Sequence, residues 1–287
     1  MTQEHLIDAQ TLAARLGSDD LVIIDCSVVL HRPEGGGPYR VEAQWDAYQE
    51  AHIPGANFAD LVSVFADPSA RFPFAIPVPD DFASAASAIG IGEGVTVVVY
   101  SQASPMWATR MWWLLRYHGF DDVAVLDGGL TAWRSAGLPV ESGEGSLPKP
   151  RPFTVKLRPE LLATQADVHA ALEDGQTCLV NALTPEAFRG DGVTSYSRPG
   201  RIPGSVSVPA GSLVDPQTWM YQPLESLRGE LGRYVEAETA PVFYCGGGIS
   251  ATVDIFAMSL LGRDDVRLYD GSLTEWSANP DLPLEIG

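Results

Sequence analysis

The chain reads AVLDGGLTAW at residues 124–133 and RLYDGSLTEW at residues 267–276, so one pattern occurs twice, 143 residues apart. Two further segments repeat in the same order at nearly the same spacing: VVVYS at 97–101 corresponds to PVFYC at 241–245, and Ile-Pro-Gly at 53–55 corresponds to Ile-Pro-Gly at 202–204. Self-similarity over such distances identifies a repeated architecture before any single motif is weighed. The sequence therefore predicts two copies of one domain.

Each copy alternates short apolar segments with longer helical ones. Strands are expected at residues 21–25, 95–100, 178–181 and 241–244, and helices at residues 107–118 and 250–261. Gly119 and Gly262 follow these helices, in the position where a left-handed C-cap is usual. Because strands alternate with helices and the second strand of each copy is almost wholly apolar, we expect an α/β fold. Each of its two tandem domains should be a mainly parallel sheet with helices on both faces.

The length of 287 residues also fits two domains of roughly 100 to 200 residues each. Residues 141–158 begin with a stretch rich in Gly, Ser, Pro and charge, which is typical of a linker. We therefore expect domains at 1–140 and 159–287, joined by a linker at 141–158. The alternation at 153–157 predicts a strand leading into the second domain, and Thr164 is a candidate N-cap for a helix that runs through Leu172.

The composition narrows the choice of partners and compartment. Lys and Arg total 18 against 37 Asp and Glu, a net charge of −19, which argues against nucleic acid or an anionic membrane as partner. No secretion signal and no apolar run of ~18 residues is present, so a cytoplasmic protein with no membrane partner is expected. The three cysteines are too few for a disulfide framework and lack metal-ligand spacing, which predicts a reducing compartment and no metal.

The most reactive segment lies between the strand at 241–244 and the following helix, and reads Cys245-Gly246-Gly247-Gly248-Ile249-Ser250. Consecutive glycines allow backbone N–H groups to converge on one point, and the helix N-terminus adds its dipole, so this loop is a candidate anion site. Cys245 lies at its rim, where a thiolate nucleophile is favoured. Cys26 and Cys178 fall in predicted strands and are expected to be core residues.

With these repeats and this loop, the chain resembles the tandem rhodanese family over nearly its whole length. The resemblance implies that the second domain is catalytic, that loop residues 246–250 cradle a persulfide on Cys245, and that no cofactor is needed. It also implies that the first domain is a related copy that has lost its cysteine, with Ser101 in that position. The loop is more similar to the Cys-Gly-Ser-Gly-Val-Thr loop of 3-mercaptopyruvate sulfurtransferases than to the Cys-Arg-Lys-Gly-Val-Thr loop of thiosulfate sulfurtransferases.

Two positions depart from the mercaptopyruvate pattern. Gly247 stands where those enzymes have a catalytic serine, and Ala187 stands where they have an arginine that holds the substrate carboxylate. The candidate replacements for that arginine are Arg198 and Arg201, and Arg110 is a third candidate that could reach the cleft between the domains, with a structural ion pair as the equal alternative for it. The sequence therefore leaves two candidate donors, 3-mercaptopyruvate and thiosulfate.

The resulting hypothesis is a sulfurtransferase. Cys245 would take sulfur from a small anionic donor and pass it to a thiol, cyanide or protein thiol acceptor. One alternative is a noncatalytic sulfur-relay or anion-binding protein. A phosphatase is disfavoured because Ala251 occupies the place where a guanidinium would grip the phosphate oxygens.

Overall fold

The computed structural model describes residues 5–31, 33, 35–37, 39–145, 148–192 and 194–287, and contains two five-stranded sheets whose strand pairings are all parallel. The first sheet has the order β1 (Leu6–Ile7), β7 (Val123–Leu126), β6 (Thr96–Tyr100), β2 (Leu21–Asp25), β5 (Asn57–Phe58). The second has the order β8 (Leu162–Ala163), β12 (Arg267–Tyr269), β11 (Val242–Tyr244), β9 (Leu179–Asn181), β10 (Val206–Ser207). The two orders correspond strand for strand, so the predicted tandem α/β fold is confirmed.

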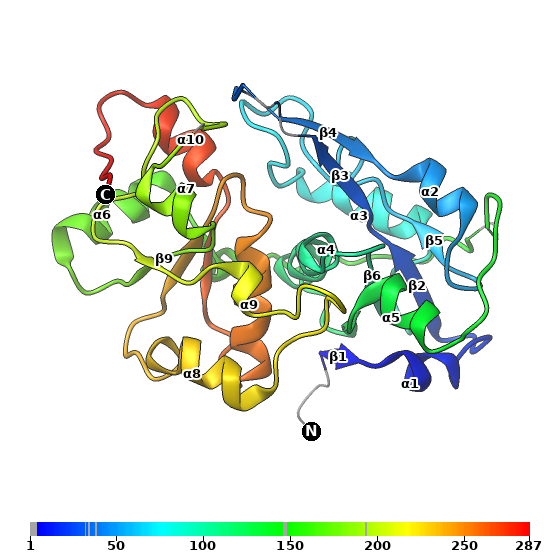
Figure 1. The fold of residues 1–287 in the computed structure, drawn as a ribbon. Helices are drawn as coiled ribbons and strands as arrows, with labels where there is room; N and C mark the ends of the chain where they lie inside the picture. Colours follow the sequence, from blue (N-terminus) through cyan, green and yellow to red (C-terminus); the bar gives the residue numbers. More distant parts are fainter. Residues whose placement is uncertain (1–4, 32, 34, 38, 146–147, 193) are drawn as a thin grey trace.

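Helices surround both sheets (Figure 1). Those of the first half are α1 (Ala9–Ala13), α2 (Trp45–Glu50), α3 (Pro79–Ala88), α4 (Met106–Tyr117) and α5 (Gly129–Ser135). Those of the second are α6 (Gln165–Asp174), α7 (Pro185–Arg189), α8 (Leu224–Val235), α9 (Ala251–Leu260) and α10 (Ser272–Ala278), with 3-10 turns at Pro159–Leu161 and Ala210–Ser212. The first half also carries an antiparallel hairpin of β3 (Val28–His31) and β4 (Arg40–Ala43). Within the described ranges, no helix has the length and apolar character that a membrane span requires.

The repeated residues make the same hydrogen bonds in both copies. In each Ile-Pro-Gly turn the isoleucine N–H donates to a tyrosine hydroxyl, from Ile53 to Tyr100 Oη (3.2 Å) and from Ile202 to Tyr244 Oη (3.1 Å). After each Asp-Gly turn a leucine N–H donates to the end of the central strand, from Leu130 to Ser101 O (3.0 Å) and from Leu273 to Cys245 O (3.1 Å). The indole of each motif tryptophan donates to a proline carbonyl, from Trp133 to Pro139 O (2.7 Å) and from Trp276 to Pro283 O (2.8 Å). Each Ile-Pro-Gly turn and each Asp-Gly turn is therefore tied to the end of a central strand. Ser101 and Cys245 follow these two strand ends.

The two halves contact each other mainly through helices α4 and α9, which lie side by side at the centre of the molecule (Figure 1). The hydroxyls of Thr109 and Thr252 meet at 2.8 Å in this interface. The aspartates of the repeated motif bond reciprocally across it, because Asp127 accepts from Tyr221 N (2.9 Å) and Asp270 accepts from the other half. The repeat thus specifies both the domain fold and the way the two copies pair.

The strand expected at residues 153–157 is wrong, because this segment is irregular. Its backbone bonds to loop carbonyls, with Lys156 N donating to His118 O at 2.9 Å, and the Phe153 ring packs against Phe82. The alternating apolar residues therefore pack on the first half rather than in a sheet. The predicted N-cap is confirmed, because the Thr164 hydroxyl accepts from Asp167 N in a capping box at the start of α6.

Candidate active site

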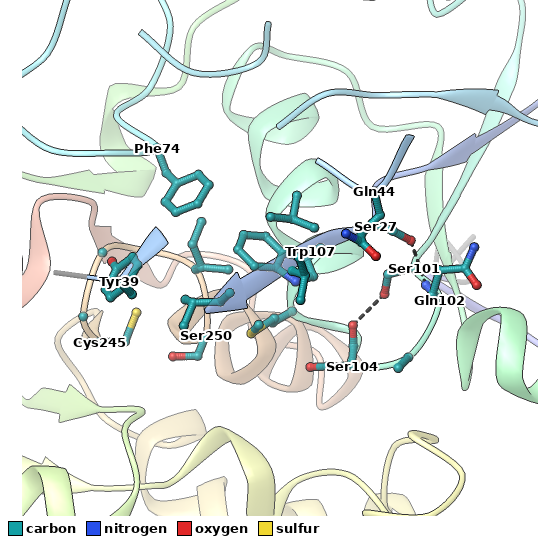
Figure 2. A pocket seen from close by; sticks show the side chains of 18 of the residues that line it. Ser27, Tyr39, Gln44, Phe74, Ser101, Gln102, Ser104, Trp107, Cys245 and Ser250 are labelled. Carbon is teal, nitrogen blue, oxygen red and sulfur yellow. Dashed lines mark hydrogen bonds between the residues drawn. The ribbon is translucent and has the colours of Figure 1, made fainter. Parts of the chain in front are cut away.

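The loop of residues 245–250 connects β11 to α9, and this strand, tight loop and helix arrangement confirms the expected local structure. A cavity of about 470 Å³ opens over it, lined by every loop residue except Gly248. Figure 2 shows the Cys245 sulfur at one end of the cavity, beside Tyr39 and Ser250. Cys245 is only 2% exposed and yet lines the cavity, so a substrate reaches its sulfur through the cavity alone.

The three glycines of the loop differ in how strongly their surroundings require glycine. A Cβ at Gly246 would overlap the Tyr196 hydroxyl, so this position keeps the tyrosine close to the loop. Gly248 has a φ of +74°, and a Cβ there would lie 2.7 Å from the Asp270 backbone oxygen. Gly247 is less restricted, because its nearest neighbour, the Tyr39 hydroxyl, would be 3.2 Å from a Cβ. The loop therefore needs glycine at its second and fourth positions more than at its third.

Ser272 holds the loop by side-chain hydrogen bonds, and the sequence analysis did not identify it as a site residue. Its hydroxyl accepts hydrogen bonds from the backbone N–H of Cys245 and of Gly248, both at 3.1 Å, and donates to Tyr269 O at 2.8 Å. Ser272 is fully buried and has a φ of +48°, a left-handed conformation that is uncommon for a residue other than glycine. One feature of the sequence could have identified this residue: the repeated motif reads Asp-Gly-Gly-Leu-Thr in the first copy and Asp-Gly-Ser-Leu-Thr in the second, so that Ser272 replaces the equivalent of Gly129.

Removing the Ser272 hydroxyl is expected to loosen the loop and to lower kcat/KM by about tenfold, because two loop amides lose their acceptor. Both variants leave two buried amides without their acceptor and should lose stability, but Ser272→Gly relieves the left-handed strain and should lose less than Ser272→Ala, which retains it. Steady-state kinetics and thermal unfolding of both variants check this. Equal activity in wild type and Ser272→Gly would show that the hydroxyl does not position the loop.

The remaining amides of the loop are available for a ligand. In the part of the chain that the structure describes, the backbone N–H groups of Gly246, Gly247, Ile249 and Ser250 have no hydrogen-bond acceptor. All four residues line the cavity, and helix α9 starts directly behind them. Such a set of unpaired amides at a helix N-terminus can bind an anion without a basic side chain.

The three candidate arginines do not reach this cavity. Arg110 is 1% exposed and donates to Asp270 Oδ1 (2.7 Å), Gly248 O (3.2 Å) and Phe74 O (2.6 Å), underneath the loop. Arg198 donates to the backbone oxygens of residues 277, 279 and 282, and Arg201 to those of residues 188 and 287 and to the Glu285 carboxylate. Each guanidinium is occupied by structural bonds in this geometry, and donor binding by one of the three arginines stays a prediction.

Burial raises the pKa of three other ionisable groups in the chain. Burial raises the pKa of the fully buried Cys26 thiol well above its ordinary value, as expected for a core thiol, and burial also raises the pKa of the Cys178 thiol, which is half-buried rather than in the core. Asp254 lies in the first turn of α9, and burial, followed by the nearby charge of Cys245, raises the pKa of its carboxyl well above the usual value. Burial thus favours the protonated form of this carboxyl.

The corresponding loop of the first half lines the same cavity. Ser101 stands at the position equivalent to Cys245, and its hydroxyl donates to Ser104 O at 2.6 Å (Figure 2). A serine hydroxyl does not act as a sulfur carrier, and this one is occupied within its own loop. The first half thus contributes a wall of the cavity.

Known proteins resemble both halves. The family model of the rhodanese-like domain matches residues 8–136 and 164–279. The chain is 36% identical over 300 residues to a probable 3-mercaptopyruvate sulfurtransferase of Pseudomonas aeruginosa, covering 100% of both chains. It is 35% identical to the putative thiosulfate sulfurtransferase SseB of Mycobacterium tuberculosis, covering 98% of this chain and 97% of SseB.

A solved structure agrees with these sequence matches. The crystal structure of the 3-mercaptopyruvate sulfotransferase SseA from Escherichia coli superposes with a TM-score of 0.77 at 27% identity, covering 94% of this chain and 98% of SseA. The similarity therefore extends over both halves of the chain.

Proposed function

Because this chain belongs to the rhodanese family and is a sulfurtransferase of the EC 2.8.1 class, we propose that Cys245 is its sulfur carrier. The observation that carries the proposal is the position of its sulfur at one end of a cavity, in a loop with four backbone amides that have no acceptor among the described residues (Figure 2). Cys26 and Cys178 lack both features. Residues 159–287 would then form the catalytic domain, residues 1–140 the cavity's opposite wall, and residues 141–158 the linker.

In the first step the Cys245 thiolate attacks the outer sulfur of thiosulfate or the single sulfur of 3-mercaptopyruvate. A sulfur–sulfur bond to Cys245 forms, the donor's bond to that sulfur breaks, and the electron pair leaves with sulfite or with the enolate of pyruvate, which takes up a proton. In the second step an acceptor thiolate or cyanide attacks the outer sulfur of the persulfide, and the electron pair returns to Cys245. The loop amides stabilise the negative charge between the two steps.

The donor is a small anion, and we infer that the loop amides rather than an arginine hold it. Curated relatives carry the names of both 3-mercaptopyruvate and thiosulfate sulfurtransferases, and the cavity accommodates either donor. All three cysteines are unpaired, which fits a reducing compartment such as the cytoplasm.

Incubation with thiosulfate or 3-mercaptopyruvate is expected to add the mass of one sulfur atom to the peptide that contains Cys245, and cyanide should remove it. Mass spectrometry of the digested protein checks this, with the peptides of Cys26 and Cys178 as internal controls that remain unmodified. If neither donor labels Cys245, or if the label appears on another cysteine, the proposal fails.

A further inference from the structure

The cavity over Cys245 extends well beyond the catalytic loop. Figure 2 shows Cys245 and Ser250 at one end, Trp107 in the middle, and a group of uncharged polar side chains at the other end. We call this group the Ser/Gln lobe, and it consists of Ser27, Gln44, Ser101, Gln102 and Ser104. All of these residues belong to the first half. The lobe in the first half therefore corresponds to the space over the catalytic loop in the second half.

The cavity is larger than the donor requires. A liquid water takes about 30 Å³, and at that allowance the seven heavy atoms of 3-mercaptopyruvate take at most about 210 Å³. This is less than half of the cavity's volume of about 470 Å³, and thiosulfate is smaller still. A cavity of this size is typical of sites for larger organic ligands, in the range of roughly 300–1,000 Å³. A second molecule therefore fits beside the persulfide.

The polar groups of the Ser/Gln lobe are partly committed to the fold. The Ser27 hydroxyl accepts from Gln102 N (2.8 Å), the Gln102 side chain donates to Ala51 O (3.2 Å), and Ser101 donates to Ser104. Among the described residues, the Gln44 amide and the Ser104 hydroxyl have no hydrogen-bond partner, whereas the Ser27 hydroxyl also bonds to the Asp25 carboxyl. These groups offer both donors and acceptors, and none is charged.

Such a lobe discriminates by charge. A carboxylate or sulfonate that entered it would lose hydration and would gain no cationic partner from the lobe, and the net charge of −19 adds further repulsion. An amide or hydroxyl group, in contrast, can exchange its water hydrogen bonds for those of the lobe. Trp107 lies between the lobe and Cys245 (Figure 2), and its apolar ring suits an aliphatic stem.

We propose that the Ser/Gln lobe binds the body of the sulfur acceptor, and that this acceptor is a low-molecular-weight thiol with an uncharged body carrying amide or hydroxyl groups. The inference rests on the proposed function of Cys245. The acceptor's thiolate attacks the outer sulfur of the Cys245 persulfide, a new sulfur–sulfur bond forms, the bond to Cys245 breaks with its electron pair on Cys245, and the acceptor leaves as a persulfide.

The test uses full-length enzyme loaded with thiosulfate and two thiol probes of similar length, neutral N-acetylcysteamine and anionic 2-mercaptoethanesulfonate, with cyanide as a minimal acceptor. Ala103 is exposed and lines the lobe, so Ala103→Trp fills it, while Ala136→Trp places the same side chain on an exposed site at the end of α5. We expect Ala103→Trp to lower the rate ratio of N-acetylcysteamine to cyanide at least tenfold and Ala136→Trp to leave it unchanged.

A second variant tests the chemistry without filling space. Gln44→Leu removes the amide at nearly constant volume, and it is expected to slow N-acetylcysteamine at least fivefold relative to 2-mercaptoethanesulfonate. Using the rate ratio of the two probes within each variant cancels their difference in intrinsic thiol reactivity. The inference would be overturned if the ratio of N-acetylcysteamine to cyanide were unchanged in Ala103→Trp and the ratio of N-acetylcysteamine to 2-mercaptoethanesulfonate were unchanged in Gln44→Leu. It would also be overturned if a protein thiol were the only acceptor that is used. Failure of the persulfide to form at all would instead reject the proposed function.

Discussion

Cys245→Ser is expected to lower sulfur transfer from both thiosulfate and 3-mercaptopyruvate by at least about a thousandfold, because a serine hydroxyl neither ionises near neutral pH nor forms a persulfide. The substitution hardly changes the side-chain volume, and the backbone N–H at this position keeps its bond to Ser272 Oγ. The fold should therefore be retained, which circular dichroism and thermal unfolding check beside the steady-state rates.

Cys178→Ser is the matched control for this substitution. Cys178 is half-buried at the start of β9, outside the cavity, and its replacement should leave both activities close to those of the wild type. Retention of more than a tenth of wild-type activity by Cys245→Ser would mean that another group carries the sulfur.

The second large effect is expected for Arg110→Met, which should lower the free energy of unfolding by about 3–5 kcal/mol. Arg110 and Asp270 form a buried ion pair at 2.7 Å between the two halves. Removing the guanidinium leaves the Asp270 carboxylate without its cation and frees the Gly248 carbonyl of the catalytic loop. Chemical denaturation measures the loss of stability, and activity should fall with it because the loop loses an anchor.

Two further variants separate the ion pair from general destabilisation. Adding Asp270→Asn to Arg110→Met removes the uncompensated charge and should recover part of the stability. Arg189→Met breaks an exposed pair with Asp191, and should cost no more than about 1 kcal/mol. A loss of under about 1 kcal/mol in Arg110→Met would show that Asp270 is satisfied by other contacts, such as the Ile76 N–H.

The fold was predictable where the sequence repeats itself. The strand at residues 21–25 coincides with β2, and the helices expected at 107–118 and 250–261 differ from α4 and α9 by a single residue at each end. Local patterns succeed there because both periodicity and the glycine after each helix act within a few residues. The expected strand at 153–157 failed because its alternating side chains pack on a surface that is distant in sequence.

For the site, the sequence alone determined that Cys245 lies on a glycine-rich loop between a strand and a helix, because all of these features are contiguous in the chain. The tertiary structure decided which side chains surround that loop. Of the two roles that the sequence left open for Arg110, the structure shows the ion pair and identifies Asp270 as its partner, and it shows that Ser272 accepts from two loop amides. Neither role can be read locally, because each depends on how two segments that are separated in sequence are brought together by the packing of the domains.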